Sequence, residues 1–288
     1  MRLVTYSVHG KTSIGKVVGS TVVDLADVFD GAPQTMLELL QGGDAVLSKL
    51  AAIGAGVTSY ALSDVALEAP IRNPQKYLAI GLNYQDHIDE VVARGGKAPE
   101  HQIWFNKQVS CITGPFDPIF RPKVSDKMDY EAELAVVIGK RCRHISKEEA
   151  LTAVGGYMIA NDVTARDWQR MTPQWTLGKS FDSHGPIGPW IVTPDEIRDP
   201  QALAIRLYVN GELRQKTSTA NMLFDIADQI SHLSKVMTLE PGDILATGTS
   251  SGAGWGMDPP RFLQPGDVVR VEIDGIGHIE NTVADEPG

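Results

Sequence analysis

Residues 129–139 read Asp-Tyr-Glu-Ala-Glu-Leu-Ala-Val-Val-Ile-Gly, a stretch that joins two glutamates to a continuous apolar run. The run Leu134–Ile138 is long enough for a strand that is buried on both faces. Because side chains alternate along a strand, Glu131 and Glu133 are expected to point the same way where the chain enters the core. Left unpaired there, the two carboxylates would repel each other and would be costly to desolvate.

A hard divalent cation would remove this cost, because carboxylates are its preferred ligands. The alternative is that both glutamates lie at an exposed rim of the strand, where salt bridges neutralise them. The pattern alone leaves these two interpretations open.

The rest of the chain alternates many short strand patterns with few helical ones. Strands are expected at Leu3–Val8, Ile14–Val18, Thr21–Asp24, Tyr77–Gly81, Tyr157–Ala160, Leu203–Val209, Glu212–Lys216, Ile244–Thr247, Val268–Ile273 and Gly277–Val283. Helices are expected at Thr35–Leu40, Ala45–Ile53, Tyr84–Arg94, Lys147–Val154 and Met222–Val236. Asn210-Gly211 is a strong hairpin signal.

These elements predict a β-rich α+β fold, a roll or barrel-like sheet with helices packed outside. Pro70 and Pro74 mark the boundary between a small N-terminal α+β domain, residues 1–70, and a larger domain, residues 71–288.

Composition excludes several classes of function. The 288 residues carry 26 Lys and Arg against 36 Asp and Glu, a net charge of −10, which makes nucleic acid a poor partner. No apolar run reaches about 18 residues, so no membrane span is expected. The start of the chain does not resemble a signal peptide, and Cys111 and Cys142 form no disulfide framework. A cytoplasmic protein is the expectation.

Asp162 is a candidate third acidic ligand, because it ends the buried run Tyr157–Ala160. Arg166 and Gln169 would follow it on one face of a helix. Three carboxylates would leave about three of the six positions that Mg²⁺ prefers open to water or substrate, as a catalytic metal requires. The alternative is that Asp162 caps the helix.

His87 and Glu90 lie three residues apart in the predicted helix Tyr84–Arg94. Glu90 on the same face could orient the imidazole and make His87 a general base. The alternative is an ordinary surface pair. Gly95-Gly96 would let this helix move as a lid.

Two glycine-containing loops complete the candidate site. Lys179, within Gly178-Lys179-Ser180-Phe181-Asp182, either binds a substrate anion or is an exposed loop lysine. The backbone N–H groups of 247–254 could cradle a carboxylate. This loop lacks the spacing of a nucleotide-binding loop, and no serine-hydrolase elbow accompanies Ser183-His184.

Taken in order, these motifs resemble the fumarylacetoacetate hydrolase family over residues 71–284, and most of all its bacterial and mitochondrial domain-containing members. The segments that carry the resemblance are GLNYQDHIDE (81–90), WFNK (104–107), DYEAELAVVIG (129–139), NDVTARDWQ (161–169), QWTLGKSFD (174–182), GPIGPW (185–190), TGTSSGAG (247–254) and FLQPGDVV (262–269). The resemblance implies a mixed β-sandwich roll in the C-terminal domain and a homodimer.

The resemblance also implies a divalent metal, Mg²⁺ or Mn²⁺, held by Glu131, Glu133 and Asp162. It assigns catalytic roles to the lid pair His87 and Glu90 and to Lys179. Residues expected to bind the substrate are Tyr84, Lys107, Arg166, Gln169 and Thr249. Two positions depart from the family pattern. Ser250 stands where TGTP is usual, and Asp182-Ser183-His184 stands where a bulkier apolar or aromatic residue often follows. Both departures bear on specificity more than on chemistry.

The implied reaction is a metal-dependent hydrolysis of the C–C bond of a 2,4-dioxo acid, acylpyruvate-type or sugar-derived. The products would be pyruvate, or a related 2-oxo acid, and a carboxylic acid. The same metal-enolate site would also serve an oxaloacetate decarboxylase or a keto–enol tautomerase or isomerase. A binding protein without catalysis is the remaining alternative.

Overall fold

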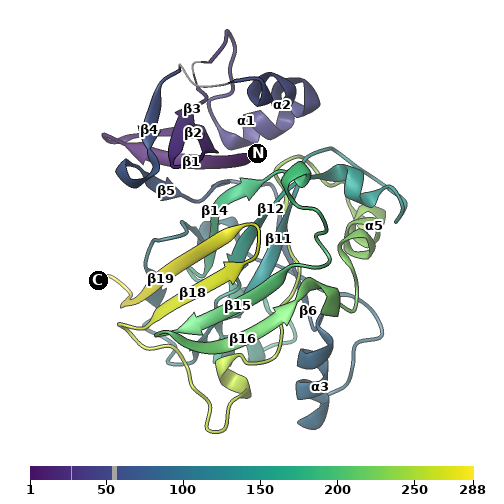
Figure 1. Cartoon of the computed structure of the whole chain (residues 1–288). Coiled ribbons are helices and arrows are strands. Elements are labelled where there is room, and N and C mark those ends of the chain that lie inside the picture. The colour runs from purple at the N-terminus through teal and green to yellow at the C-terminus, as the bar shows by residue number, and fades with distance from the viewer. Residues whose placement is uncertain (27, 54–56) are drawn as a thin grey trace.

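The computed structural model describes residues 1–26, 28–53 and 57–288, and a long mixed sheet runs through this part of the chain (Figure 1). Its strands follow the order β4-β3-β2-β1-β14-β12-β11-β17-β6-β7, with β5 paired to β1 and β8 to β14. Their bounds are β1 Arg2–Val8, β2 Lys11–Val18, β3 Thr21–Asp24, β4 Ser59–Ala61, β5 Ala66–Glu68, β6 Tyr77–Gly81, β7 Ile103–Asn106, β8 Ile112–Thr113, β11 Ala132–Ile138, β12 Val154–Asn161, β14 Gly185–Val192 and β17 Ile244–Ala246.

A second sheet packs against the first and closes the sandwich. Its order is β16-β15-β18-β19-β9. The bounds are β9 Ile119–Arg121, β15 Ala204–Val209, β16 Glu212–Ser218, β18 Val268–Ile273 and β19 Gly277–Asp285. The predicted hairpin at Asn210-Gly211 is confirmed, with φ angles of 52° and 78° at its two central residues. A short pair, β10 Met128–Asp129 and β13 Thr164–Ala165, lies beside the site described below.

Strand β11 shows why its sequence is apolar throughout. Leu134 and Val136 pack into the core between the two sheets, with residues such as Leu207. Ala135 and Val137 pack on the opposite face, in a core shared with the N-terminal segment. Every residue of β11 is buried, as the run of apolar residues predicted.

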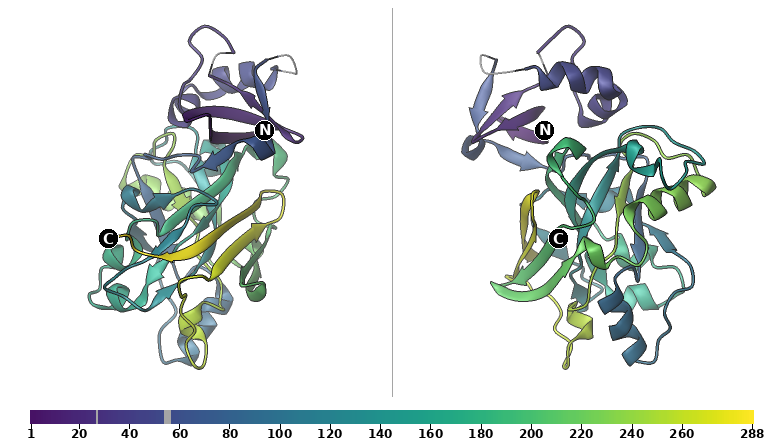
Figure 2. Two further views of the ribbon diagram at one scale, coloured as in Figure 1. Left: turned by 90° about the vertical axis from the view of Figure 1, so that its left-hand side faces the viewer. Right: turned by 45° about the vertical axis from the view of Figure 1, so that its right-hand side comes forward.

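Five α-helices form in the described part of the chain. They are α1 Met36–Gln41, α2 Gly43–Ala51, α3 Gln85–Ala93, α4 Arg166–Arg170 and α5 Ile226–Val236. Figure 2 shows α1 and α2 grouped with the N-terminal strands, away from α3 and α5. No helix among the described residues is both long and apolar enough to cross a membrane.

The N-terminal segment is joined to the rest through the main sheet. Strand β1 pairs with β14 at Arg2–Val192 and Leu3–Ile191. The division at residue 70 stays a prediction.

Two predicted helices differ from the observed ones. Lys147–Val154 is not an α-helix, since only a short 3-10 helix forms there, at Ala150–Ala153. Helix α5 begins at Ile226 instead of Met222, because the Asp225 side chain accepts a hydrogen bond from the N–H of Asp228 and caps the helix at that point. The β-rich α+β sandwich predicted from the sequence is otherwise the fold observed.

Candidate active site

Adjacent antiparallel strands bring three acidic side chains together. Glu131 directly precedes β11, and Glu133 is its second residue, so alternation turns both toward one side. Asp162 directly follows β12, and its N–H donates to the carbonyl of Glu131 (2.9 Å). Carboxylate oxygens of the three residues lie within 4.8 Å of one another, and all three residues are buried. The alternative of an exposed strand rim is wrong.

The charges in this cluster are unevenly compensated. Burial, Asp162 and Glu131 raise the pKa of the Glu133 carboxyl well above its ordinary value. Burial also opposes ionisation of Glu131, but Arg166 and Lys179 outweigh it and lower the pKa of that carboxyl. Within the described chain Glu133 accepts a hydrogen bond only from the N–H of Gly248 (2.8 Å). Converging oxygen donors with excess buried negative charge fit a hard divalent cation such as Mg²⁺ or Mn²⁺.

Lys179 is buried at the centre of the cluster. Its Nζ lies 2.6 Å from Oε2 of Glu131 and 2.6 Å from Oδ2 of Asp162. The alternative of an exposed loop lysine is therefore wrong. Burial opposes the charge on Lys179, but the two carboxylates raise the pKa of its ammonium overall, so the side chain stays charged.

Lys107 lies elsewhere than predicted. Its ammonium donates to Oδ1 of Asp162 (2.6 Å), to the carbonyl of His184 (3.0 Å) and to the carbonyl of Lys179. These three acceptors use all three of its protons. Lys107 is not among the described residues that line the cavity, so these contacts make it a positioning residue for the candidate ligand Asp162.

The segment before α3 is held firmly, and the helix presents the predicted pair. Asn83 donates to the carbonyls of Thr247 (2.8 Å) and Phe224 (3.1 Å). On α3, Nδ1 of His87 lies 3.0 Å from Oε2 of Glu90. The imidazole is buried, so the alternative of a surface pair is wrong. Tyr84, predicted to bind substrate, is buried at the start of the helix and is not among the described residues that line the cavity.

Helix α4 begins later than the sequence indicated. Its N-cap residue is Ala165, so Asp162 is not a helix cap. Arg166 donates through Nε to Asp129 (2.8 Å) and through Nη2 to Glu131 (2.6 Å), and its Nη1 donates to Gln169 (3.0 Å). In this arrangement Arg166 orients Glu131, while Gln169 stands beside it on the cavity wall.

Asp129 is a site residue that the sequence analysis missed. Its carboxylate accepts from Arg166 and from the N–H groups of Gly254 (2.7 Å) and Trp255 (3.1 Å). The signal was available, because Asp129 continues the same alternation as Glu131 and Glu133. Asp129 therefore ties the loop that carries Trp255 to the acidic cluster.

Gln215 was also missed, and it supports the loop 247–254. Its amide donates to Oγ1 of Thr249 (2.9 Å) and accepts from the N–H of Ala132 (2.9 Å). No local signal marks Gln215, since it lies on β16, far from both partners in sequence. In this loop the Gly248 N–H serves Glu133, whereas the sequence had suggested a substrate carboxylate.

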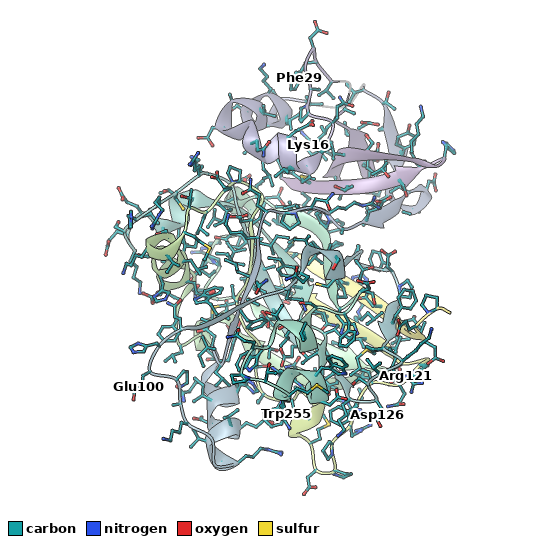
Figure 3. All side chains as sticks on the ribbon, turned by 180° about the vertical axis from the view of Figure 1, so that it is seen from behind. Lys16, Phe29, Glu100, Arg121, Asp126 and Trp255 are labelled. Atoms are coloured by element: carbon teal, nitrogen blue, oxygen red, sulfur yellow. The ribbon has the colours of Figure 1, made fainter. Side chains whose placement is uncertain are left out.

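Helix α3 packs closely against the loop that carries Trp255, which Figure 3 labels. The rings of His87 and Trp255 meet edge to face, with centroids 6.0 Å apart. A Cβ added at Gly256 would lie 2.1 Å from Oε1 of Glu90, so a larger residue there would displace the carboxylate that contacts His87. Helix α3, which the sequence predicted to act as a lid, thus packs against the loop that carries Trp255.

A cavity of about 440 Å³ joins these parts, a size suited to a small metabolite. The residues that line it near the acidic cluster and helix α3 are Glu131, Glu133, Lys179, Thr249 and His87. Farther out its lining includes Arg94, Gly96, Gln169, Arg170, Thr172, Trp175 and Trp255. A candidate base and a candidate metal centre therefore face one space.

Several known proteins are similar to this chain in sequence and in fold. The mitochondrial oxaloacetate tautomerase fahd2 of Xenopus laevis is 44% identical over 268 residues, which cover 92% of this chain and 83% of that protein. The fumarylacetoacetate hydrolase structure of Exiguobacterium antarcticum has a TM-score of 0.85 at 40% identity, covering 99% of this chain and all of that one. The maleylpyruvate hydrolase of Sphingobium sp. SYK-6, solved with manganese(II) and pyruvate, has a TM-score of 0.84 at 32% identity, with both chains fully covered.

The family model described as fumarylacetoacetate (FAA) hydrolase C-terminal matches residues 76–284, the part of the chain that contains every site residue named above. With this match and these relatives, the chain belongs to the fumarylacetoacetate hydrolase family.

Proposed function

We propose that the protein is a metal-dependent enzyme that interconverts the keto and enol forms of a 2-oxo acid, with oxaloacetate as the first substrate to test. The observation that carries this proposal is that the His87–Glu90 pair and the acidic cluster share one cavity. The oxaloacetate tautomerase relative supports this substrate, because its similarity extends over 92% of the chain.

Glu131, Glu133 and Asp162 would hold Mg²⁺ or Mn²⁺. When bound, such an ion withdraws electrons from the 2-oxo group and so acidifies the neighbouring C–H. His87, with Nδ1 held by Glu90, takes the proton from C3 and returns it to the 2-oxo oxygen to give the enol. Lys179 supplies a buried positive charge beside the negative charge that develops on oxygen.

Hydrolysis of a C–C bond is the second candidate, and it is the reaction that the sequence resemblance implied. In this version His87 deprotonates a water molecule, which attacks the C4 carbonyl of a 2,4-dioxo acid. The C3–C4 bond breaks, and C3 is protonated to leave a 2-oxo acid and a carboxylic acid. The maleylpyruvate hydrolase relative supports this alternative. A homodimer remains a prediction in either case.

The test is product analysis with the purified protein. With Mg²⁺ or Mn²⁺ bound, the protein should accelerate the loss of the enol absorbance of oxaloacetate, and a chelator should return this loss to its spontaneous rate. The reaction should release neither CO₂ nor pyruvate beyond the background. Release of CO₂ and pyruvate would identify a decarboxylase. Release of a new carboxylic acid and pyruvate from acylpyruvates, with oxaloacetate unaffected, would favour the hydrolase.

A further inference from the structure

Four cationic side chains line the cavity among the described residues, and two of them are already neutralised. They are Arg94, Arg166, Arg170 and Lys179. Arg166 is paired with Asp129 and Glu131, and Lys179 with Glu131 and Asp162. The remaining two, Arg94 and Arg170, are more exposed than Arg166 and Lys179, so they form the outer part of the cavity lining.

The two outer arginines have no acidic partner in the described part of the chain, where no carboxylate oxygen lies within 4.0 Å of either guanidinium. Arg94 donates to the carbonyl of Gly256, which carries no net charge. Burial and the positive charges of Arg166 and Arg94 lower the pKa of Arg170. Like charges are thus gathered at this end of the cavity, and the anion that partly offsets them, the carboxylate of Asp129, is already paired with Arg166.

Both outer arginines contact the ring of Trp255. The guanidinium of Arg94 lies 5.3 Å from the centroid of its ring, and that of Arg170 lies 5.1 Å from it. Each contact is a cation–π interaction worth about 0.5–1 kcal/mol at an exposed site. The Trp255 backbone is itself fixed by Asp129, so the aromatic ring holds the two cations near the cavity.

The arginines come from separate elements. Arg94 is the C-cap of the lid helix α3, whereas Arg170 ends α4. Docking of α3 therefore brings a second positive charge toward Arg170. An anion bound in the outer cavity would remove the resulting repulsion and favour the docked lid.

The charge balance of the inner site shows which anion remains to be matched. Asp129 and Arg166 cancel each other. The three candidate ligands are offset by a divalent ion with Lys107 and Lys179, which leaves one positive charge in excess. One carboxylate of a 2-oxo acid uses that charge, which leaves the two outer arginines available to a second carboxylate.

We propose that Arg170, together with Arg94 from the lid, binds a second carboxylate at the end of the substrate remote from the 2-oxo group, so that the enzyme selects dicarboxylic 2-oxo acids. This inference rests on the proposed function for the orientation of the substrate, and it names the substrate class and the residues that select it.

The test compares two ligands that cannot enolise, malate and 2-hydroxybutanoate, in which a methyl group replaces the second carboxylate. Binding to the Mg²⁺-loaded protein is measured by calorimetry for the wild type, Arg170→Gln, Arg94→Gln and the control Lys97→Gln. Lys97 is exposed after α3 and is not among the described residues that line the cavity.

We expect the wild type to bind malate more tightly than 2-hydroxybutanoate. Arg170→Gln should weaken the binding of malate by about 10- to 100-fold, as for a lost hydrogen bond to a charged group. The affinity of Arg170→Gln for 2-hydroxybutanoate should stay within about two-fold of the wild-type value, and Lys97→Gln should change the affinity for neither ligand. Equal losses for both ligands, an unchanged affinity for malate in Arg170→Gln, or an equal effect of Lys97→Gln would overturn the inference.

A kinetic measurement separates this inference from the proposed function. If oxaloacetate is the substrate, Arg170→Gln should raise its KM and leave that of its 4-methyl ester unchanged; a uniform change in both would overturn the inference. If the wild type does not tautomerise oxaloacetate but still prefers malate through Arg170, the proposed function fails and the second-carboxylate site stands.

Discussion

The ammonium of Lys107 lies 2.6 Å from Oδ1 of Asp162, and both side chains are fully buried. Breaking a buried ion pair by removing one partner costs about 3–5 kcal/mol, and although Asp162 would keep Lys179, the acidic cluster would lose one of the cations that offset it. We expect Lys107→Met to lower the free energy of unfolding of the metal-free protein by this amount in denaturant titrations. Mg²⁺ should restore part of the loss, because a cation at Asp162 compensates the charge.

The exposed pair of Lys140 and Asp44, at 2.8 Å, provides a matched control. Lys140→Met should change stability by no more than about 0.5 kcal/mol, because solvent screens this pair. An equal cost for the two substitutions would contradict the argument from burial.

Glu131 and Glu133 should respond in opposite ways to loss of charge. Glu133→Gln removes a negative charge that burial and two neighbouring carboxylates disfavour, so the metal-free protein should melt at a higher temperature at pH 8. Glu131→Gln should lower that temperature, because Arg166 and Lys179 lose their shared partner. Both variants should lose most of the stabilisation by Mg²⁺, which calorimetric melting with and without the ion measures.

His87→Asn should reduce turnover by about 10²–10⁴, the usual contribution of a positioned acid or base. Glu90→Gln should reduce it less, since the imidazole remains but loses its orienting carboxylate. Mg²⁺ affinity, followed by calorimetry, should stay unchanged in both variants. An active His87→Asn enzyme would remove His87 from the mechanism.

His184 predicts a loss of stability in mild acid. Burial, followed by the charge of Lys107, lowers the pKa of its imidazole to about 3, from an ordinary value of 6.5. The folded protein keeps this ring neutral while the unfolded chain protonates it below pH 6.5, so stability is full above that pH and falls as the pH drops toward 3.

His184→Gln should remove this contribution. Relative to the variant, the wild type should lose about 1.4 kcal/mol for each pH unit below the ordinary histidine value, measured by urea unfolding between pH 7 and 5. Parallel pH profiles of the two proteins would show that His184 is not the titrating group.

The sequence predicted those parts of the site that depend on local periodicity. Alternation along β11 was enough to place Glu131 and Glu133 together, and helical spacing was enough to pair His87 with Glu90. The same alternation includes Asp129, but its role depends on hydrogen bonds from the loop that carries Trp255, which local periodicity does not predict.

Other residues could not be assigned from the sequence because their partners are distant in it. Lys107 is 55 residues from Asp162, and Gln215 is 34 from Thr249, so their roles depend on how strands pair. The predicted helix Lys147–Val154 formed only in part. Its N–H groups bond three residues back, as Ala150 does to Lys147 and Thr152 to Glu149, and the carbonyl of Ala153 accepts from Gly139 and Lys140, at the end of β11, instead of continuing a helix. The contacts of Arg94 and Arg170 with the ring of Trp255 likewise require three separate segments to meet.

The clash that any Cβ at Gly256 would make with Glu90 bears on attempts to engineer new specificity. A library that randomises this position would mostly yield variants in which the Glu90 carboxylate is displaced from His87, and these would lose activity toward every substrate alike. Diversity is better introduced at Thr172 and Arg170, because both line the cavity and neither depends on the close contact between Gly256 and Glu90. Gly256 is therefore a residue that a designer should leave unchanged.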